Sequence, residues 1–185
     1  MNNKILKGSI IAIILIVFLI FIASSVTSAE AKKSNDTTIE TLSKGGLVIK
    51  YPSDWGYSKA NSNYSIMSIS KLSSIDSKGV GQININCEKK PIEGDFVTFV
   101  NSTYKALDSS SSSFEMVSSG ESMIGDRKAL EYIYVSNDTG DEREHKAIWF
   151  EKGGQAYVLL YSAPLDKFES NMYVFNYVLS EIKIT

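Results

Sequence analysis

Apolar and polar side chains alternate along several stretches that follow residue 45, and a period of two predicts β-strands with one buried face. Leu47, Ile49 and Tyr51 mark the inner face of the first such stretch. Pro52 has no amide hydrogen to donate to a sheet, so the strand is predicted to end there. A short turn then brings Trp55 back over the strand end.

More extended stretches follow, and they are predicted at 64–70, 80–88, 114–117, 123–124, 128–136, 145–151 and 155–163. The last of them is the most hydrophobic, so it is predicted to lie at the centre of the sheet. Tight turns are predicted at Gly125-Asp126 and at Gly153-Gly154.

The stretch 80–88 has two different faces. One face carries Ile83, Ile85 and Cys87, and the other carries Gln82, Asn84 and Asn86. Because the apolar face points inward, the single cysteine of the chain is predicted to be a buried structural thiol rather than a nucleophile.

From Asp95 the apolar period changes to three and four, which predicts a helix of about 13 residues. Its apolar side consists of Phe96, Phe99, Val100, Tyr104 and Leu107. A serine tract at 109–113 is predicted to be a surface loop. A second helix is predicted from Asp166, with an apolar stripe of Phe168, Met172, Phe175, Leu179 and Ile182.

The order of these elements predicts the fold class. Three strands, a helix, several strands and a final helix suit one antiparallel β-sheet with helices packed on it, because each helix is apolar on one side only. The fold class is therefore α+β.

Residues 1–31 differ in composition from the rest of the chain. Two lysines precede a long apolar run, and Ala29-Glu30-Ala31 fits a signal-peptide cleavage site. The uncharged span 8–29 would also be roughly 30 Å long as a helix, which suits a retained membrane anchor. Both alternatives stay open. If the leader is retained, residues 10–29 are the predicted contact with the membrane.

Residues 32–44 show no sustained apolar period and are predicted to be a flexible linker, so that the folded domain comprises residues 45–185. Under either alternative for the leader, this domain is predicted to be extracytoplasmic, either secreted or anchored to the outer face of the cell membrane. Cys87 is the only cysteine. The domain must therefore be stabilised by its core, without an intrachain disulfide.

Charge and composition narrow the functional classes. The net charge is −2 and the isoelectric point is near 5.5. These values give no electrostatic reason to expect nucleic-acid binding. Asn-x-Ser/Thr sequences occur at Asn35, Asn63, Asn101 and Asn137, and they are candidate glycosylation sites if the host has the machinery.

The only histidine, His145, follows an acidic loop that contains Asp138, Asp141, Glu142 and Glu144. The spacing of these residues does not match a calcium loop or another known ligand motif. No Gly-x-Ser-x-Gly elbow accompanies the histidine either. The loop is therefore interpreted as a solvated hairpin connection, and no metal, cofactor or catalytic residue is predicted.

Aromatic residues make up 11% of the chain, and most of them fall at positions expected inside the core. Trp55, Tyr57 and Tyr64 lie near strand ends instead. We expect these three to be candidates for the rim of a partner-binding groove.

Four segments carry a family resemblance: "IKYPSDW", "MIGDRKALEYIY", "KGGQAYVLLYSAP" and "FESNMYVFNYVLSEIKI". Together they resemble the PsbP-like superfamily over residues 45–184. The resemblance implies an α-β-α sandwich around an antiparallel sheet, in a protein that is usually exported or lumenal. Members of that superfamily include photosystem II extrinsic subunits and a nuclear-import factor that binds a small GTPase. Because these functions are unrelated, the fold alone does not predict the function of this chain.

The sequence therefore predicts an exported, non-enzymatic domain that binds or stabilises a protein or a cell-envelope component. The alternative is an exported hydrolase that uses carboxylate residues, since paired carboxylates are assembled by folding and leave no linear motif.

Overall fold

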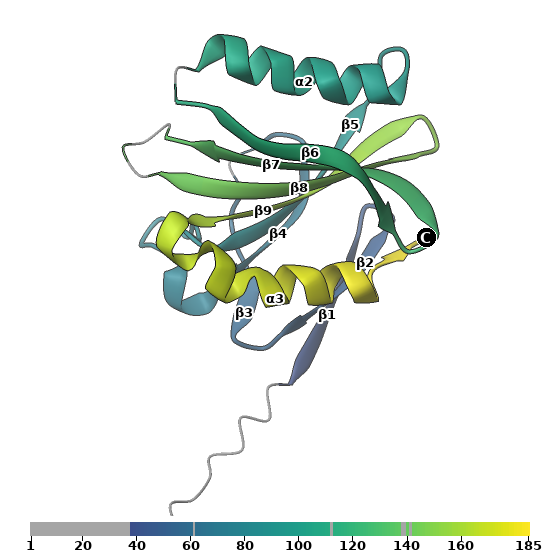
Figure 1. Ribbon diagram of the computed structural model, residues 1–185. Helices are drawn as coiled ribbons and strands as arrows, with labels where there is room; N and C mark the ends of the chain where they lie inside the picture. Colours follow the sequence, from purple (N-terminus) through teal and green to yellow (C-terminus); the bar gives the residue numbers. More distant parts are fainter. Residues whose placement is uncertain (1–37, 61, 112, 138–139, 141) are drawn as a thin grey trace, which may run out of the picture. The chain divides into compact units, whose positions relative to one another are not determined.

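The structure is a computed structural model that describes residues 38–60, 62–111, 113–137, 140 and 142–185. Its helices and strands are β1 (Ile39–Lys44), β2 (Leu47–Pro52), β3 (Trp55–Tyr57), β4 (Ser65–Lys71), the 3-10 helix η1 (Leu72–Ser74), β5 (Asn84–Pro91), α2 (Phe96–Ser110), β6 (Glu115–Ile124), β7 (Arg127–Ser136), β8 (Arg143–Lys152), β9 (Gln155–Pro164), α3 (Leu165–Glu181) and β10 (Lys183–Ile184). Figure 1 shows their arrangement.

A seven-stranded antiparallel sheet with the order β3-β4-β5-β9-β8-β7-β6 forms the middle layer. Strand β9 is its central strand, as its hydrophobicity predicts. The β8–β9 hairpin turns at Gly153 and Gly154, which have positive φ angles of 58° and 70°. Only glycine adopts such angles without strain, so these two residues suit a tight hairpin turn.

The two helices lie on opposite faces of this sheet (Figure 1). Helix α2 begins after Asp95, whose side chain accepts a hydrogen bond from the Thr98 amide at 2.9 Å. Its buried residues are Val100 and Tyr104. The Trp149 Nε1 group of β8 donates to the Tyr104 hydroxyl at 2.8 Å, so the helix is held to the sheet by packing and by a buried hydrogen bond.

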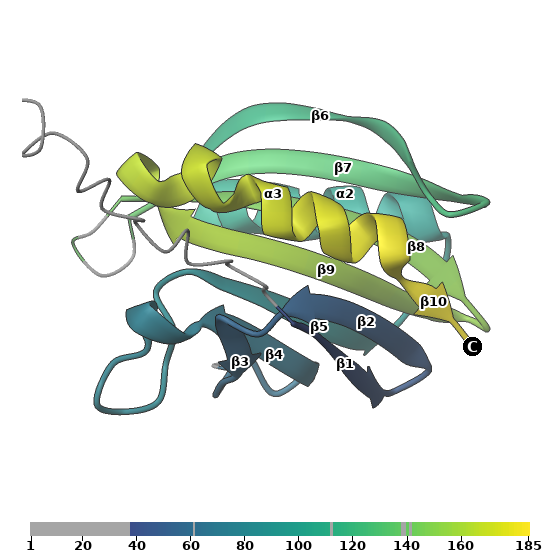
Figure 2. The same ribbon diagram turned by 90° about the horizontal axis from the view of Figure 1, so that it is seen from below.

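Helix α3 covers the other face, as Figure 2 shows. Phe168 and Phe175 are buried against Tyr161 of β9, and the Tyr161 hydroxyl donates to the Phe168 carbonyl at 2.8 Å. Cys87 lies in the same cluster and has no exposed surface. The prediction of an inward-facing, buried thiol is therefore confirmed, and burial raises its pKa to about 12.

A second antiparallel sheet, with the order β1-β2-β10, is separate from the seven-stranded one. The sequence predicts a single sheet that contains residues 47–51, and the structure places them in this smaller sheet. The predicted linker is also wrong in part, because Ile39–Lys44 forms strand β1 and pairs with β2 from Ile39 opposite Pro52 to Lys44 opposite Leu47. Residues 32–37 of that linker lie outside the described residues.

The structure differs from two smaller predictions as well. Residues 115–117 and 123–124 belong to one strand, β6, which pairs with β7 across a bulge between Met116 and Ser118, and Phe114 lies just before it. Helix α2 extends through Ser110, so the serine tract begins inside the helix. The fold class itself is confirmed as α+β.

The predicted leader, residues 1–31, lies outside the described residues. Among the residues that the structure describes, no helix is long and apolar enough to cross a membrane.

The packing of α3 generates a stability prediction. We expect Phe175→Ala to lower the free energy of unfolding by about 3–5 kcal/mol, because it deletes a fully buried ring from the core. Tyr173→Ala on the same helix is the matched control, since Tyr173 is 59% exposed and should change stability by less than about 0.5 kcal/mol. Urea unfolding measures both, and equal losses would contradict this account of the core.

Candidate functional site

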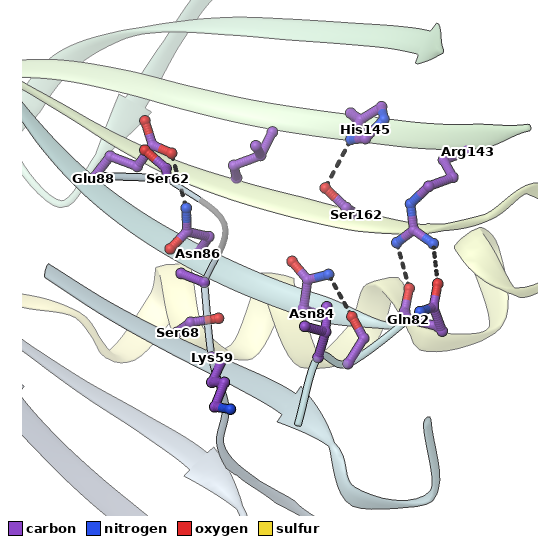
Figure 3. Close-up of a pocket in the computed structure, with 14 residues that line it drawn as sticks. Lys59, Ser62, Ser68, Gln82, Asn84, Asn86, Glu88, Arg143, His145 and Ser162 are labelled. Atoms are coloured by element: carbon purple, nitrogen blue, oxygen red, sulfur yellow. Dashed lines mark hydrogen bonds between the residues drawn. The ribbon is translucent and has the colours of Figure 1, made fainter. Parts of the chain in front are cut away.

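A polar pocket of about 350 Å³ opens on the face of the seven-stranded sheet that carries α2. Figure 3 shows its side chains. Among the described residues it is lined by Lys59, Ala60, Ser62, Ser68, Val80, Gly81, Gln82, Asn84, Asn86, Glu88, Arg143, His145, Leu160 and Ser162. We call this the polar pocket.

Strand register explains why these side chains share a face. Asn86 of β5 pairs with Ser68 of β4 and with Leu160 of β9. Ser162 of β9 pairs with His145 of β8. Because directly paired residues point to the same side of a sheet, four adjacent strands each contribute polar groups to one surface.

Asn86 and Glu88 form one side of the polar pocket and are buried, at 8% and 7% exposure. The Asn86 Nδ2 group donates to Glu88 Oε1 at 2.9 Å, and Ser65 Oγ donates to Asn86 Oδ1 at 2.5 Å. Lys90 Nζ lies 2.9 Å from Glu88 Oε2. Both carboxylate oxygens of Glu88 and the amide oxygen of Asn86 therefore already have partners within the protein.

His145 lies at the opposite side, in β8. Its Nδ1 atom is 2.7 Å from Ser162 Oγ and its Nε2 atom is 3.0 Å from Ser136 Oγ. Tyr134 stacks on the imidazole with ring centroids 4.6 Å apart. Burial, aided by the positive charge of Arg143, lowers the pKa of His145 to about 4. The ring is therefore neutral near pH 7.

Arg143 closes one end of the polar pocket by donating to Gln82, through Nη1 to the side-chain oxygen at 3.0 Å and through Nη2 to the main-chain carbonyl. Asn84 Nδ2 donates to the Gly81 carbonyl at 2.8 Å. Gly81 approaches Ser70 so closely that a Cβ atom would lie 2.1 Å from the serine Cβ. Glycine is therefore required at this position of the wall.

The predicted partner-binding aromatics fall in different places. The prediction for Trp55 is wrong, because its side chain is 2% exposed and belongs to the core beside α3. Tyr57 and Tyr64 are 63% and 53% exposed. Tyr57 lines a neighbouring cavity that shares Lys59 with the polar pocket. The Lys90 ammonium lies over the Tyr64 ring, 5.4 Å from its centroid. Their role in binding stays a prediction.

The candidate glycosylation sites are also separated. Asn63 and Asn137 are exposed residues outside helices and strands. Asn101 lies in α2, where its side-chain oxygen accepts a hydrogen bond from the Tyr132 hydroxyl at 2.6 Å. Asn35 lies outside the described residues. Modification at any of the four stays a prediction.

The structure shows the contacts of His145, the only histidine of the chain. The residue belongs to strand β8, and its two ring nitrogens contact serine hydroxyls. Among the described residues that line the polar pocket, Glu88 is the single acid, whereas a paired-carboxylate hydrolase needs two. Glu144 has its pKa raised by burial and by Glu169, but neither residue lines this pocket.

The polar pocket is not predicted from the sequence, although some of its lining residues form a recognisable pattern there. The alternation in residues 80–88 predicts the polar face of Gln82, Asn84 and Asn86, but it does not predict that this face forms the wall of a cavity. Two neighbouring signals, Ser162 in an otherwise apolar strand and His145 next to the acidic loop, are 17 residues apart in sequence and are joined only by the β8–β9 register.

Comparison with known proteins supports the fold. A scan of protein-family models finds no match to this chain, and a search of curated proteins finds none either. Among solved structures, the chain is similar to the cyanobacterial PsbP protein CyanoP from Synechocystis sp. PCC 6803, with 13% identity and a TM-score of 0.58 over 83% of this chain and 96% of that chain.

The chain is also similar to LpqN from Mycobacterium tuberculosis, which is involved in cell envelope biogenesis. That similarity has 17% identity and a TM-score of 0.57, and it covers 86% of this chain and 97% of that chain. At these identities the comparison establishes the fold alone. The PsbP-like resemblance is therefore confirmed as a fold assignment.

The neutral His145 predicts a pH dependence of stability. The unfolded chain binds a proton near pH 6.5 and the folded chain only near pH 4, so stability is highest above pH 6.5 and falls as the pH drops toward 4. We expect a loss of about 1–2 kcal/mol from this group, because partial exposure screens the full effect. In urea unfolding across this pH range, His145→Gln should show a shallower decline than the wild type. Parallel declines would contradict the assignment of a buried neutral imidazole.

Proposed function

We propose that this PsbP-like domain is an exported, non-catalytic module that binds a component of the cell envelope in the polar pocket. The observation that carries the proposal is the pocket itself. It is a concave surface of amides, hydroxyls and charged groups on one face of the seven-stranded sheet, and several of these groups are buried.

The arrangement favours binding because its polar side chains are held in place before any ligand arrives. Asn84, Asn86 and Arg143 each form hydrogen bonds to neighbouring protein groups. Fixed side chains lose little conformational entropy on association, so each new hydrogen bond contributes more to affinity.

The described contacts of Ser162 and His145 differ from those of a serine hydrolase. Ser162 is 5% exposed and its hydroxyl lies 2.7 Å from His145 Nδ1. The second nitrogen of that histidine contacts Ser136 rather than a carboxylate. A serine nucleophile normally needs a base that a third, acidic group orients, and the described partners of His145 are hydroxyls and an aromatic ring.

Export is supported by the leader-like composition of residues 1–31. The similarity to LpqN, a protein involved in cell envelope biogenesis, favours the envelope as the place of action. The exposed Tyr57 lines the cavity next to the polar pocket, and the exposed Tyr64 contacts Lys90, which pairs with Glu88. Both rings would enlarge the contact with a ligand that extends beyond the polar pocket.

Occlusion of the polar pocket tests this proposal. Ala60 is exposed at its rim, so Ala60→Trp places a bulky side chain there without disturbing the core. We expect the wild type to bind saturably to isolated envelopes of the source organism in a co-sedimentation assay. Ala60→Trp should weaken that binding by about tenfold or more, because it blocks access to the buried polar groups.

The matched control is Ser180→Trp, which adds the same side chain at an exposed position of α3, outside the polar pocket. It should bind as the wild type does. The proposal fails if the two variants bind equally well, or if the wild type shows no saturable binding.

A further inference from the structure

We propose that the polar pocket takes an anionic group of its ligand, a carboxylate or a phosphate. This inference rests on the proposed function and adds the chemical class of the ligand. Three features of the described residues carry it: hydrogen-bond acceptors that are already used, donors that remain, and positive charge on both sides of β5.

The acceptors on the floor of the polar pocket are largely occupied by protein donors. Glu88 accepts from Asn86 at one oxygen and pairs with Lys90 at the other. The Asn86 oxygen accepts from Ser65, and the Gln82 oxygen accepts from Arg143. A ligand that mainly donates hydrogen bonds would find few groups to receive them.

Donors, in contrast, remain. A side-chain amide has two N–H groups, and the structure gives Asn86 Nδ2 one acceptor, Glu88. Asn84 Nδ2 donates likewise to Gly81. In the part of the chain that the structure describes, no carboxylate forms an ion pair with Lys59, so its ammonium group can bind a ligand.

Two cations stand on either side of this donor surface. Lys59 follows β3 and Arg143 begins β8, and the strand order places β5 with Asn84 between them. Figure 3 shows both side chains at the polar pocket. The positive field of Arg143 reaches this surface, since it helps to lower the pKa of His145. Glu88 adds one negative charge, but it is paired with Lys90.

Size limits the part of the ligand that enters. A volume of about 350 Å³ equals on the order of ten water molecules at about 30 Å³ each. The polar pocket therefore suits a single acidic unit, such as a sugar acid or a glycerol phosphate, with the rest of the ligand outside near Tyr57.

The experiment uses isotopically labelled full-length protein and two pairs of small probes, glucuronate with glucose and glycerol 3-phosphate with glycerol. Each pair compares an anion with a neutral analogue of similar size. We expect at least one anion to cause saturable shifts in the backbone amide resonances of Lys59, Gly81, Asn84 and Arg143. The neutral analogues should leave these resonances unchanged. Shifts with glucuronate alone would identify a carboxylate ligand, and shifts with glycerol 3-phosphate alone a phosphate.

Charge variants test the mechanism of recognition. We expect Lys59→Gln to weaken binding of the active anion about threefold to tenfold, and Lys59→Arg to restore it, because the positive charge is what matters. Lys105→Gln changes the net charge equally on an exposed face of α2, and it should bind as the wild type does.

Failure of this inference is distinguishable from failure of the proposed function. If neutral analogues shift the same resonances as strongly as the anions, or if neither anion causes shifts centred on the polar pocket, the anionic ligand is excluded. A simultaneous loss of envelope binding in Ala60→Trp would still support the polar pocket as the binding site. Equal effects of Lys59→Gln and Lys105→Gln would overturn the assigned role of Lys59.

Discussion

The pairing of β9 with β5 and β8 is the constraint on which both cores and the polar pocket depend. Strand β9 is the central strand, and its alternate residues belong to two separate hydrophobic clusters. Tyr157, Leu159 and Tyr161 point to the α3 side, whereas Ala156 and Val158 point to the α2 side. A shift of one residue in its register would reverse these faces and place Ser162 in the α3 core.

The relative lengths of helix α2 and strand β9 explain why a polar surface lies at one end of the sheet. A 15-residue helix such as α2 is about 22 Å long, whereas a ten-residue strand such as β9 extends about 33 Å. One helix of this length leaves part of the strand uncovered. Along β9 the change occurs between Val158, which packs in the α2 cluster, and Ser162, which lines the polar pocket.

How much of this could be predicted from sequence depended on whether a pattern is local. The apolar periods of 155–163 and 166–182 are strong, so the central strand and helix α3 were identified. Strand β1 was missed because it lies at a sheet edge, and Leu42 is its only residue that is not exposed. Such a strand carries no apolar alternation. The polar pocket was missed because its walls come from four strands and from residues 59–60, 62 and 80–82, which are brought together by tertiary pairing rather than by local pattern.

The buried polar groups of this pocket are costly for the fold alone. Asn86, Glu88 and Ser162 occupy positions on inner strands where apolar side chains would extend the core, and burial of polar groups gives less stability than apolar packing even when hydrogen bonds are formed. Structures that share only 13% and 17% identity with this chain adopt a similar fold, so the fold is compatible with very different sequences. These polar side chains stand at buried positions that apolar side chains could fill, and this is the physical reason to look for the function there.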